Sequence, residues 1–206
     1  MRTGLKPVAI ADDVFEFVVD SPARARVLAT RLRGAGLAEE VVAGLDRVAV
    51  RFDPARIAEV SQWLTAAKLP ELDTDTAKEP IEIGVHYGGR DGPDLEWICA
   101  DLNVTRADLI ATHTDAIHTV EMIGFTPGFA YLSGLPDTFK VSRLADPRPR
   151  VPAGSIGLSA GFTGLYALQG PGGWPIIGRT DAPLFDAARS DPFLLMPGQA
   201  VRFRAL

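Results

Sequence analysis

The sequence predicts an α+β fold with two domains: a small βαββαβ domain over residues 1–79 and a β-rich sandwich or barrel over residues 80–206. Three observations support this prediction. In the first domain, β-branched runs alternate with two stretches of helically spaced apolar residues, in the split-βαβ order. Polar residues between two prolines, at 69–80, predict a linker. The second domain consists, after two short helices, of short apolar runs between Gly and Pro, a pattern typical of sheets with tight turns.

Two capping signals place the helices of the first domain. Ser21-Pro22 and Asp53-Pro54 each combine an N-cap side chain with a proline whose fixed φ suits the first helical turn. The strands predicted around these helices cover residues 14–19, 41–42, 48–52 and 81–85. This domain contains neither clustered histidines nor paired carboxylates at a suitable spacing, so we expect it to be a scaffold or docking domain without catalytic groups.

The second domain should begin with two short helices, one from Pro93 to Leu102 and one from a Thr105 cap to about Thr112. A DNA-binding helix-turn-helix is excluded because this segment is rich in Asp and Glu, the wrong charge for a phosphate backbone. The apolar runs that follow predict the strands of the sandwich or barrel; they are VEMIGF, FAYL, IGL, GLYAL, PIIG, FLLM and VRFRAL.

Composition excludes several classes of protein. The 206 residues carry a formal net charge of −5 and include no basic run, which argues against a nucleic-acid partner. No apolar run is long enough to span a bilayer, and no secretion signal opens the chain. A single cysteine, Cys99, excludes an internal disulfide and a cysteine-rich zinc site. We therefore expect a cytoplasmic protein that binds neither nucleic acid nor membrane.

The stretch from Gly124 to Thr180 differs from the rest of the chain. It holds 11 of the 20 glycines and 7 of the 16 prolines, and five basic residues against two acidic ones make it locally positive. Glycine lets a backbone approach a ligand closely and proline stiffens a loop, so this composition suits a pocket for a small anion. It also suits a barrel in which Gly and Pro only form tight turns.

The order of the motifs in this stretch resembles one family. GFTPGFAYLSGLP, PRPRVPAGS, TGLY and PGGWPIIGRT follow the upstream motif YGGRDGPDLEWIC and the pair His113-Thr114. Together they closely resemble the family called allophanate hydrolase subunit 1, which includes the B subunit of 5-oxoprolinase and the sporulation kinase inhibitor Kip. The resemblance implies a cyclophilin-like β-barrel over residues 80–206.

The resemblance also implies a function. It implies a component of an ATP-dependent amide hydrolase that converts 5-oxoproline to glutamate. Such a component is inactive alone and pairs with a homologue of allophanate hydrolase subunit 2, which corresponds to the 5-oxoprolinase C subunit, and a further 5-oxoprolinase A subunit is involved. Two alternatives stay open: an allophanate hydrolase or urea-carboxylase-like carboxyltransferase subunit, and a non-enzymatic histidine kinase inhibitor of the Kip type. The sequence has no GxxxxGK[ST] phosphate loop, so ATP would bind at a site shared with the partner.

The candidate catalytic residues are His113, Arg150 and Arg179. His113 occupies a family position and could act as an acid, a base or an anion ligand, or could be a helix-end histidine bonded to a carbonyl. Arg150 and Arg179 lie in family motifs, and a guanidinium on a proline-stiffened loop suits a phosphate or a carboxylate. No metal site is expected, because the spacing of His86, His113 and His118 does not match that of ligands on one helical face.

A second set of residues is predicted to bind substrate. The GFTPGF turn could hold a carbonyl or carboxylate oxygen with backbone N–H groups, or could form a barrel corner plugged by its two phenylalanines. Arg148 could add charge, and Ser155 a hydrogen bond, since no GxSxG motif supports a nucleophilic serine. The predicted set is Gly124, Phe125, Thr126, Pro127, Gly128, Phe129, Tyr131, Arg148 and Ser155.

Overall fold

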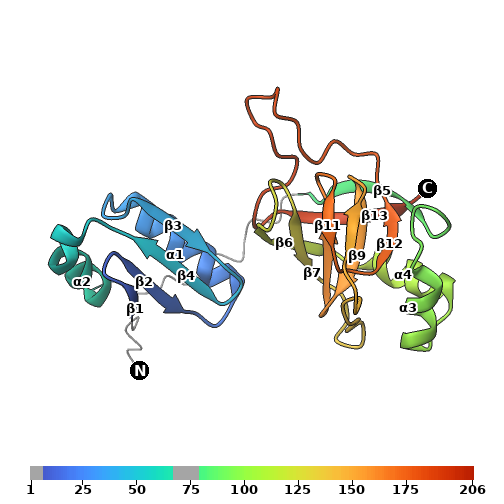
Figure 1. The fold of residues 1–206 in the computed structure, drawn as a ribbon, viewed down its shortest axis with the longest axis horizontal. Coiled ribbons are helices and arrows are strands. Elements are labelled where there is room, and N and C mark those ends of the chain that lie inside the picture. Colours follow the sequence, from blue (N-terminus) through green and yellow to red (C-terminus); the bar gives the residue numbers. More distant parts are fainter. Residues whose placement is uncertain (1–6, 67–78) are drawn as a thin grey trace. The chain divides into compact units, whose positions relative to one another are not determined.

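The computed structural model describes residues 7–66 and 79–206 (Figure 1). The chain divides into two compact units, residues 1–76 and 77–206. The fold is α+β, as the sequence predicts. The first unit combines a four-stranded antiparallel sheet with helices, and the second contains a seven-stranded mixed β-barrel.

The first unit is built on one antiparallel sheet with the strand order β1-β2-β4-β3. Its elements are β1 (Pro7–Ala11), β2 (Val14–Val18), α1 (Pro22–Gly34), β3 (Glu40–Ala43), β4 (Arg47–Arg51), the 3-10 helix η1 (Pro54–Arg56) and α2 (Ile57–Ala66). The order is ββαββα, so the prediction of a βαββαβ domain is wrong. The unit has an additional strand at its start and lacks the strand predicted at its end. Strand β1 was not predicted and pairs with β2, whereas the strand predicted at 81–85 belongs to the barrel of the second unit. The predicted linker lies mostly outside the described residues.

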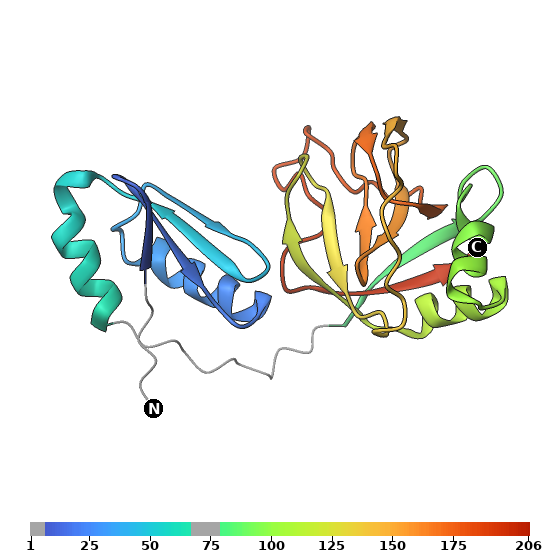
Figure 2. The same cartoon turned by 60° about the horizontal axis from the view of Figure 1, so that its bottom comes forward.

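Helix α1 packs along one face of this sheet, as Figure 2 shows. It begins as predicted: the Ser21 side chain accepts a hydrogen bond from the Arg24 N–H, and Pro22 occupies the first turn. Leu28 and Leu32, one helical turn apart, are buried in one apolar cluster with Phe17 of β2. The helix is therefore held by its amphipathic face as well as by its cap.

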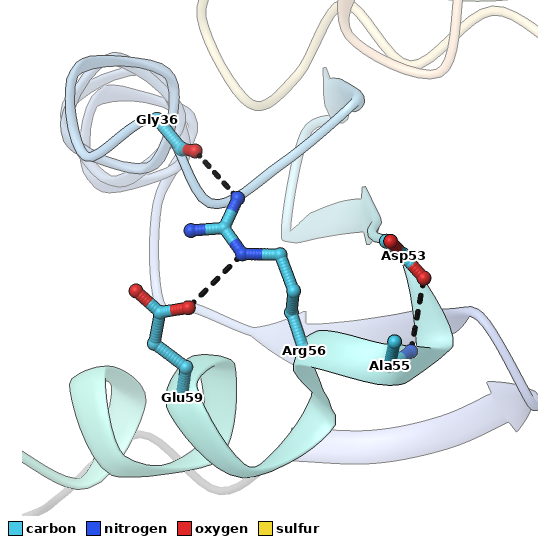
Figure 3. Close-up of polar contacts among 5 residues, drawn as sticks. All are labelled: Gly36, Asp53, Ala55, Arg56 and Glu59. Carbon is cyan, nitrogen blue, oxygen red and sulfur yellow. Dashed lines mark hydrogen bonds and ion pairs between the residues drawn. The ribbon is translucent and has the colours of Figure 1, made fainter.

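Polar contacts fix the start of α2 (Figure 3). Asp53 accepts a hydrogen bond of 2.9 Å from the Ala55 N–H, which confirms the predicted cap. The Arg56 guanidinium donates to the carbonyl of Gly36 and to the carboxylate of Glu59, both at 3.0 Å. Arg56 thereby ties the loop after α1 to the beginning of α2.

The second unit contains a closed barrel with the strand order β10-β7-β6-β13-β5-β12-β9, in which β10 also pairs with β9. Strands β5 and β13 run parallel, and the other pairs are antiparallel. The strands of this unit are β5 (Ile81–Tyr87), β6 (His118–Ile123), β7 (Ala130–Ser133), β8 (Arg148–Val151), β9 (Ser155–Ser159), β10 (Phe162–Leu165), β11 (Gly170–Gly172), β12 (Ile176–Arg179) and β13 (Ala200–Ala205). Strands β8 and β11 form a separate two-stranded sheet.

Six of the seven apolar runs coincide with barrel strands, and the run FLLM does not. Phe193 makes only an isolated bridge to Phe185, and their rings lie 5.3 Å apart. Leu195 is buried in the main core of the unit, so this run is apolar because it covers the barrel. The barrel itself is observed, whereas the finer expectation of a cyclophilin-like barrel stays a prediction.

Helices α3 (Leu95–Leu102) and α4 (Arg106–Asp115) contact barrel strands β12 and β13 respectively. Thr105 and Asp108 form a reciprocal capping box at the start of α4, which confirms the predicted cap. Within residues 7–66 and 79–206, no helix combines the length and apolarity needed to cross a membrane.

Candidate functional site

Four arginines surround a cavity of about 430 Å³ beside β8, β9 and β12, which we call the arginine pocket. It is lined by Arg90, Asp91, Pro93, Arg148, Arg150, Val151, Pro152, Ser155, Ile176 and Arg179. Four guanidinium groups against the carboxylate of Asp91 leave the cavity with an excess of positive charge. Such a cavity favours an anionic ligand.

Arg148 is held in place by Asp94, at the start of α3. The guanidinium donates one hydrogen bond of 2.7 Å to each carboxylate oxygen, a bidentate pair. The same carboxylate accepts a hydrogen bond of 2.6 Å from the Ile176 N–H, which ties the start of α3 to β12. The hydrogen bonds to Asp94 raise the pKa of the Arg148 guanidinium. Arg148 therefore lines the pocket in a fixed orientation, and its charge is already paired with that of Asp94.

Arg179 and Arg90 share the carboxylate of Asp91. Nε of Arg179 lies 3.1 Å from Oδ1 of Asp91, and this buried Nε has no hydrogen-bond partner among the described residues. Nε of Arg90 lies 3.6 Å from Oδ2. Arg150 is exposed, and no carboxylate in the part of the chain that the structure describes forms an ion pair with it. Arg150 therefore presents an unpaired charge to the pocket.

Close backbone packing brings β9 and β12 together beside this cavity. Arg179 of β12 lies opposite Ser155 of β9, and Ser155 is buried where it lines the pocket. Gly154, which precedes it, has a φ of +80°, and a Cβ at this position would lie 2.2 Å from the carbonyl oxygen of Thr180. Only glycine allows both the positive φ and this approach.

A second cavity, of about 280 Å³, lies beside β11 and has five aromatic residues in its lining; we call it the aromatic pocket. It is lined by Phe125, Phe129, Tyr131, Arg143, Leu144, Pro147, Tyr166, Pro171, Gly172, Gly173 and Trp174. The consecutive residues Pro147 and Arg148 line different pockets, as do Trp174 and Ile176. The two pockets are therefore neighbours.

The segment 124–129 forms a closed turn at the aromatic pocket. The N–H of Gly124 donates to the Phe129 carbonyl, that of Thr126 to the Gly124 carbonyl, and that of Phe129 to the Thr126 carbonyl. Within this fully described segment, the N–H groups of Phe125 and Gly128 have no backbone partner. Phe129 is buried, whereas Phe125 is 63% exposed, so one ring fills the wall and the other lies at the rim.

His113 is buried inside the second unit and lines neither pocket. Its Nδ1 lies 2.6 Å from the Tyr87 hydroxyl and its Nε2 lies 3.2 Å from the Thr163 hydroxyl, while the ring stacks on Phe203. Burial holds the pKa of His113 well below its usual range, and burial also lowers the pKa of His118. Nε2 of His118 lies 3.0 Å from the His113 carbonyl oxygen. Both histidines are therefore neutral at pH 7.

The single site predicted from the sequence divides into two pockets and one buried histidine. Four predicted residues line the arginine pocket; they are Arg148, Arg150, Ser155 and Arg179. Three others line the aromatic pocket; they are Phe125, Phe129 and Tyr131. Among the described residues, no group of three or more His, Cys, Asp or Glu is placed to hold a metal ion.

Sequence reasoning missed several residues that line the two pockets. They are Arg90 and Asp91 in the arginine pocket, and Arg143, Tyr166 and Trp174 in the aromatic pocket. Four of the five lie within the motifs YGGRDGPDLEWIC, TGLY and PGGWPIIGRT. Motif membership could have identified those four, but Arg143 lies outside the motifs.

Comparison with known proteins identifies the family. Residues 13–195 match the family described as carboxyltransferase domain, subdomain C and D. The chain belongs to this family. The match extends across both compact units, so the first unit is part of the family architecture.

Three known proteins illustrate the similarity. The 5-oxoprolinase B subunit of Escherichia coli O157:H7 is 46% identical over 123 residues, which are 60% of this chain and 56% of that protein. The chain thus spans about half the length of the curated relatives that it matches. The crystal structure of a conserved uncharacterized protein from Pyrococcus horikoshii is 32% identical, with a TM-score of 0.61, over 98% of this chain and 97% of that one. The K. lactis urea amidolyase shares the fold alone: 16% identity and a TM-score of 0.77, over 98% of this chain and 15% of that one.

Proposed function

We propose that this chain is part of an ATP-dependent 5-oxoprolinase-type amide hydrolase, which converts 5-oxoproline to glutamate. It acts with a partner of the allophanate hydrolase subunit 2 type, the counterpart of the 5-oxoprolinase C subunit. The observation that carries the proposal is the arginine pocket, in a chain 46% identical to a 5-oxoprolinase B subunit over 123 residues. A reaction that moves a phosphoryl group needs such a concentration of positive charge.

The chemistry explains why ATP and arginines belong together. An amide carbonyl is a poor electrophile, so water opens a lactam only after activation. Transfer of the γ-phosphoryl group of ATP to the lactam oxygen supplies that activation. A first water then attacks the carbon and the ring C–N bond breaks, which leaves an acyl phosphate and a free amine. A second water attacks the same carbon, and phosphate leaves with the former lactam oxygen. The products are glutamate, ADP and phosphate. In this proposal Arg150 and Arg179 contact the phosphoryl oxygens, and Arg148, fixed by Asp94, shapes the pocket.

The proposal places ATP at a site shared with the partner. The arginine pocket offers charge for phosphates, whereas the sequence contains no phosphate loop. The same fold forms 15% of the K. lactis urea amidolyase chain, so this fold occurs as a part of larger proteins. A further protein, of the 5-oxoprolinase A type, completes the proposed complex.

Co-expression tests the proposal. The chain and its subunit 2 homologue should elute as one complex in size-exclusion chromatography with light scattering. With the 5-oxoprolinase A protein added, this complex should release glutamate from 5-oxoproline in an ATP-dependent reaction, and the chain alone should not. Arg179→Ala should lower turnover by at least about tenfold, since a charge-assisted hydrogen bond contributes about 1.5–3 kcal/mol. Arg24→Ala, in the first unit, is the control. Separate peaks and no glutamate would contradict the proposal, and tight binding to a histidine kinase without turnover would favour a Kip-type inhibitor.

Carboxyl transfer is the second candidate, because the family is described as a carboxyltransferase domain. The arginine pocket would then neutralise a carboxylate. Turnover that requires a carboxylated carrier and proceeds without 5-oxoproline would favour this function over the hydrolase.

A further inference from the structure

The aromatic pocket has rigid, preformed walls. Phe129, Tyr166 and Trp174 are 2%, 2% and 7% exposed. The Phe129 ring meets those of Tyr166 and Trp174 edge-to-face, with centroids 4.9 and 5.8 Å away, and Tyr131 adds a further edge-to-face contact at 4.7 Å. Buried rings packed in this geometry hold one another in place, so the cavity needs little rearrangement to accept an apolar ring.

Gly164 in β10 lets two of these aromatic side chains pack against the strand. A Cβ on Gly164 would lie 2.7 Å from the ring of Trp174 and 2.8 Å from that of Phe129. The two rings therefore pack directly onto the strand backbone.

The pocket contains one charge. Arg143 is exposed at its edge, no acidic residue lines the cavity, and no carboxylate among the described residues forms an ion pair with Arg143. Burial raises the pKa values of the Tyr131 and Tyr166 hydroxyls, and the positive charge of Arg143 opposes this rise at both. The guanidinium of Arg143 and both tyrosines line the same, mostly apolar cavity. This arrangement complements a ligand with an apolar body and one negative group.

The size of the pocket limits the ligand. A volume of about 280 Å³ lies at the lower edge of the roughly 300–1,000 Å³ range of small-molecule sites. A nucleoside triphosphate, with its three phosphates, fits the charge of the neighbouring arginine pocket better than one arginine among aromatic rings. A single ring with one carboxylate matches both the volume and the charge of the aromatic pocket.

We infer that the aromatic pocket binds a small ring-bearing monocarboxylate, with its ring against Phe129, Tyr131 and Trp174 and its carboxylate on Arg143. If the proposed function holds, on which this identification of the ligand rests, that carboxylate is 5-oxoproline. The two neighbouring pockets then divide the reactants between them: the aromatic pocket takes the lactam and the arginine pocket takes the phosphates.

Phe125 lies at the rim of the aromatic pocket, and its ring centroid is 5.6 Å from that of Phe129. Its backbone has a positive φ of 70°, which is strained for a bulky residue.

Direct binding of 5-oxoproline tests the inference without any need for turnover. Titration calorimetry on the full chain, and on its complex with the partner, should detect binding of 5-oxoproline and of cyclopentanecarboxylate. Arg143→Gln should weaken both by about tenfold, because it removes a charge-assisted contact. It should leave the weak binding of 2-pyrrolidinone, which has no carboxylate, unchanged. Lys140→Gln is the matched control: it removes a positive charge three residues away that lines neither pocket, and should change affinity less than about twofold.

The outcomes separate this inference from the proposed function. If the complex hydrolyses 5-oxoproline but Arg143→Gln leaves both KM and affinity unchanged, the pocket assignment is wrong and the function stands. If 5-oxoproline binds in an Arg143-dependent way without hydrolysis by the complete complex, the binding site stands and the function fails. If no small carboxylate binds, but Phe125→Ala prevents assembly with the partner, the pocket holds an apolar side chain of that partner and the inference is overturned.

Discussion

Replacement of Asp94 by asparagine removes the charge that fixes Arg148 at the arginine pocket. The Asp94 carboxylate accepts two hydrogen bonds of 2.7 Å from Arg148 and one of 2.6 Å from the Ile176 N–H. Asparagine has the same shape but one acceptor oxygen, so its NH₂ group faces a donor. Removal of one partner of a buried ion pair costs about 3–5 kcal/mol. The Asp94 side chain is 12% exposed and that of Arg148 is 33% exposed, so water compensates part of the loss. We expect a loss of about 2–3 kcal/mol in the free energy of unfolding.

Urea unfolding and thermal melts of the full chain, followed by circular dichroism, measure this loss. A loss of about 2–3 kcal/mol corresponds to a fall in Tm of roughly 4–12 °C for a unit of this size. Glu96→Gln is the matched control: it makes the same chemical change on the same helix, in an exposed pair with Arg106 at 3.3 Å. Exposed pairs contribute about 0–1 kcal/mol. If Asp94→Asn costs no more than Glu96→Gln, the Asp94–Arg148 pair does not fix the pocket and the reasoning is refuted.

Three further predictions concern other parts of the structure. Gly154→Ala should destabilise the chain by at least about 2 kcal/mol in urea unfolding; Gly161→Ala, with a similar positive φ but open space around it, should cost only about 1 kcal/mol. Equal losses of stability in the two variants would contradict the close approach of Gly154 to the Thr180 carbonyl. Arg150→Ala should lower ATP-dependent turnover about tenfold and Arg150→Lys should restore little of it, because an ammonium cannot make a planar two-point contact; an unchanged rate would remove Arg150 from the site. Burial lowers the pKa values of His113 and His118, so the unfolded chain binds protons that the folded chain excludes. The free energy of unfolding should therefore be constant above the unfolded histidine pKa of about 6.5 and fall as the pH drops from about 6.5 to 5; His118→Gln should lessen this slope in urea midpoints measured over that range.

Local chemistry was readable from the sequence. The caps at Ser21, Asp53 and Thr105 were predicted because a capping side chain acts on backbone N–H groups two or three residues away. Short apolar runs between Gly and Pro predicted most barrel strands, because each run reflects a strand facing the core. Four of the ten residues that line the arginine pocket were among the predicted site residues, since proline-stiffened motifs carry Arg148, Arg150 and Ser155 on one stretch of chain.

The pairing of strands distant in sequence could not be predicted in this way. Strand β5 was assigned to the first domain because it follows a helix in sequence, yet it pairs in parallel with β13, where Ile81 lies opposite Val201. No local pattern encodes a partner so distant. The division of the site has a similar cause: Pro147 and Arg148 are adjacent in sequence but line different pockets beside β8. His113 likewise was placed near the substrate by motif alone, whereas packing against Phe203 buries it.

Oxygen transfer from the substrate to phosphate tests the proposed reaction most directly. The complex of this chain with its partners is given ATP and 5-oxoproline labelled with oxygen-18 in the lactam carbonyl, and the released phosphate is analysed by mass spectrometry. The account predicts one labelled oxygen in each phosphate, formed with one glutamate, because the lactam oxygen leaves with the phosphoryl group. It also predicts a parallel loss of labelled phosphate and glutamate in the Arg150→Ala complex. Glutamate formed with unlabelled phosphate, or at an equal rate in the Arg150→Ala complex, would contradict the account.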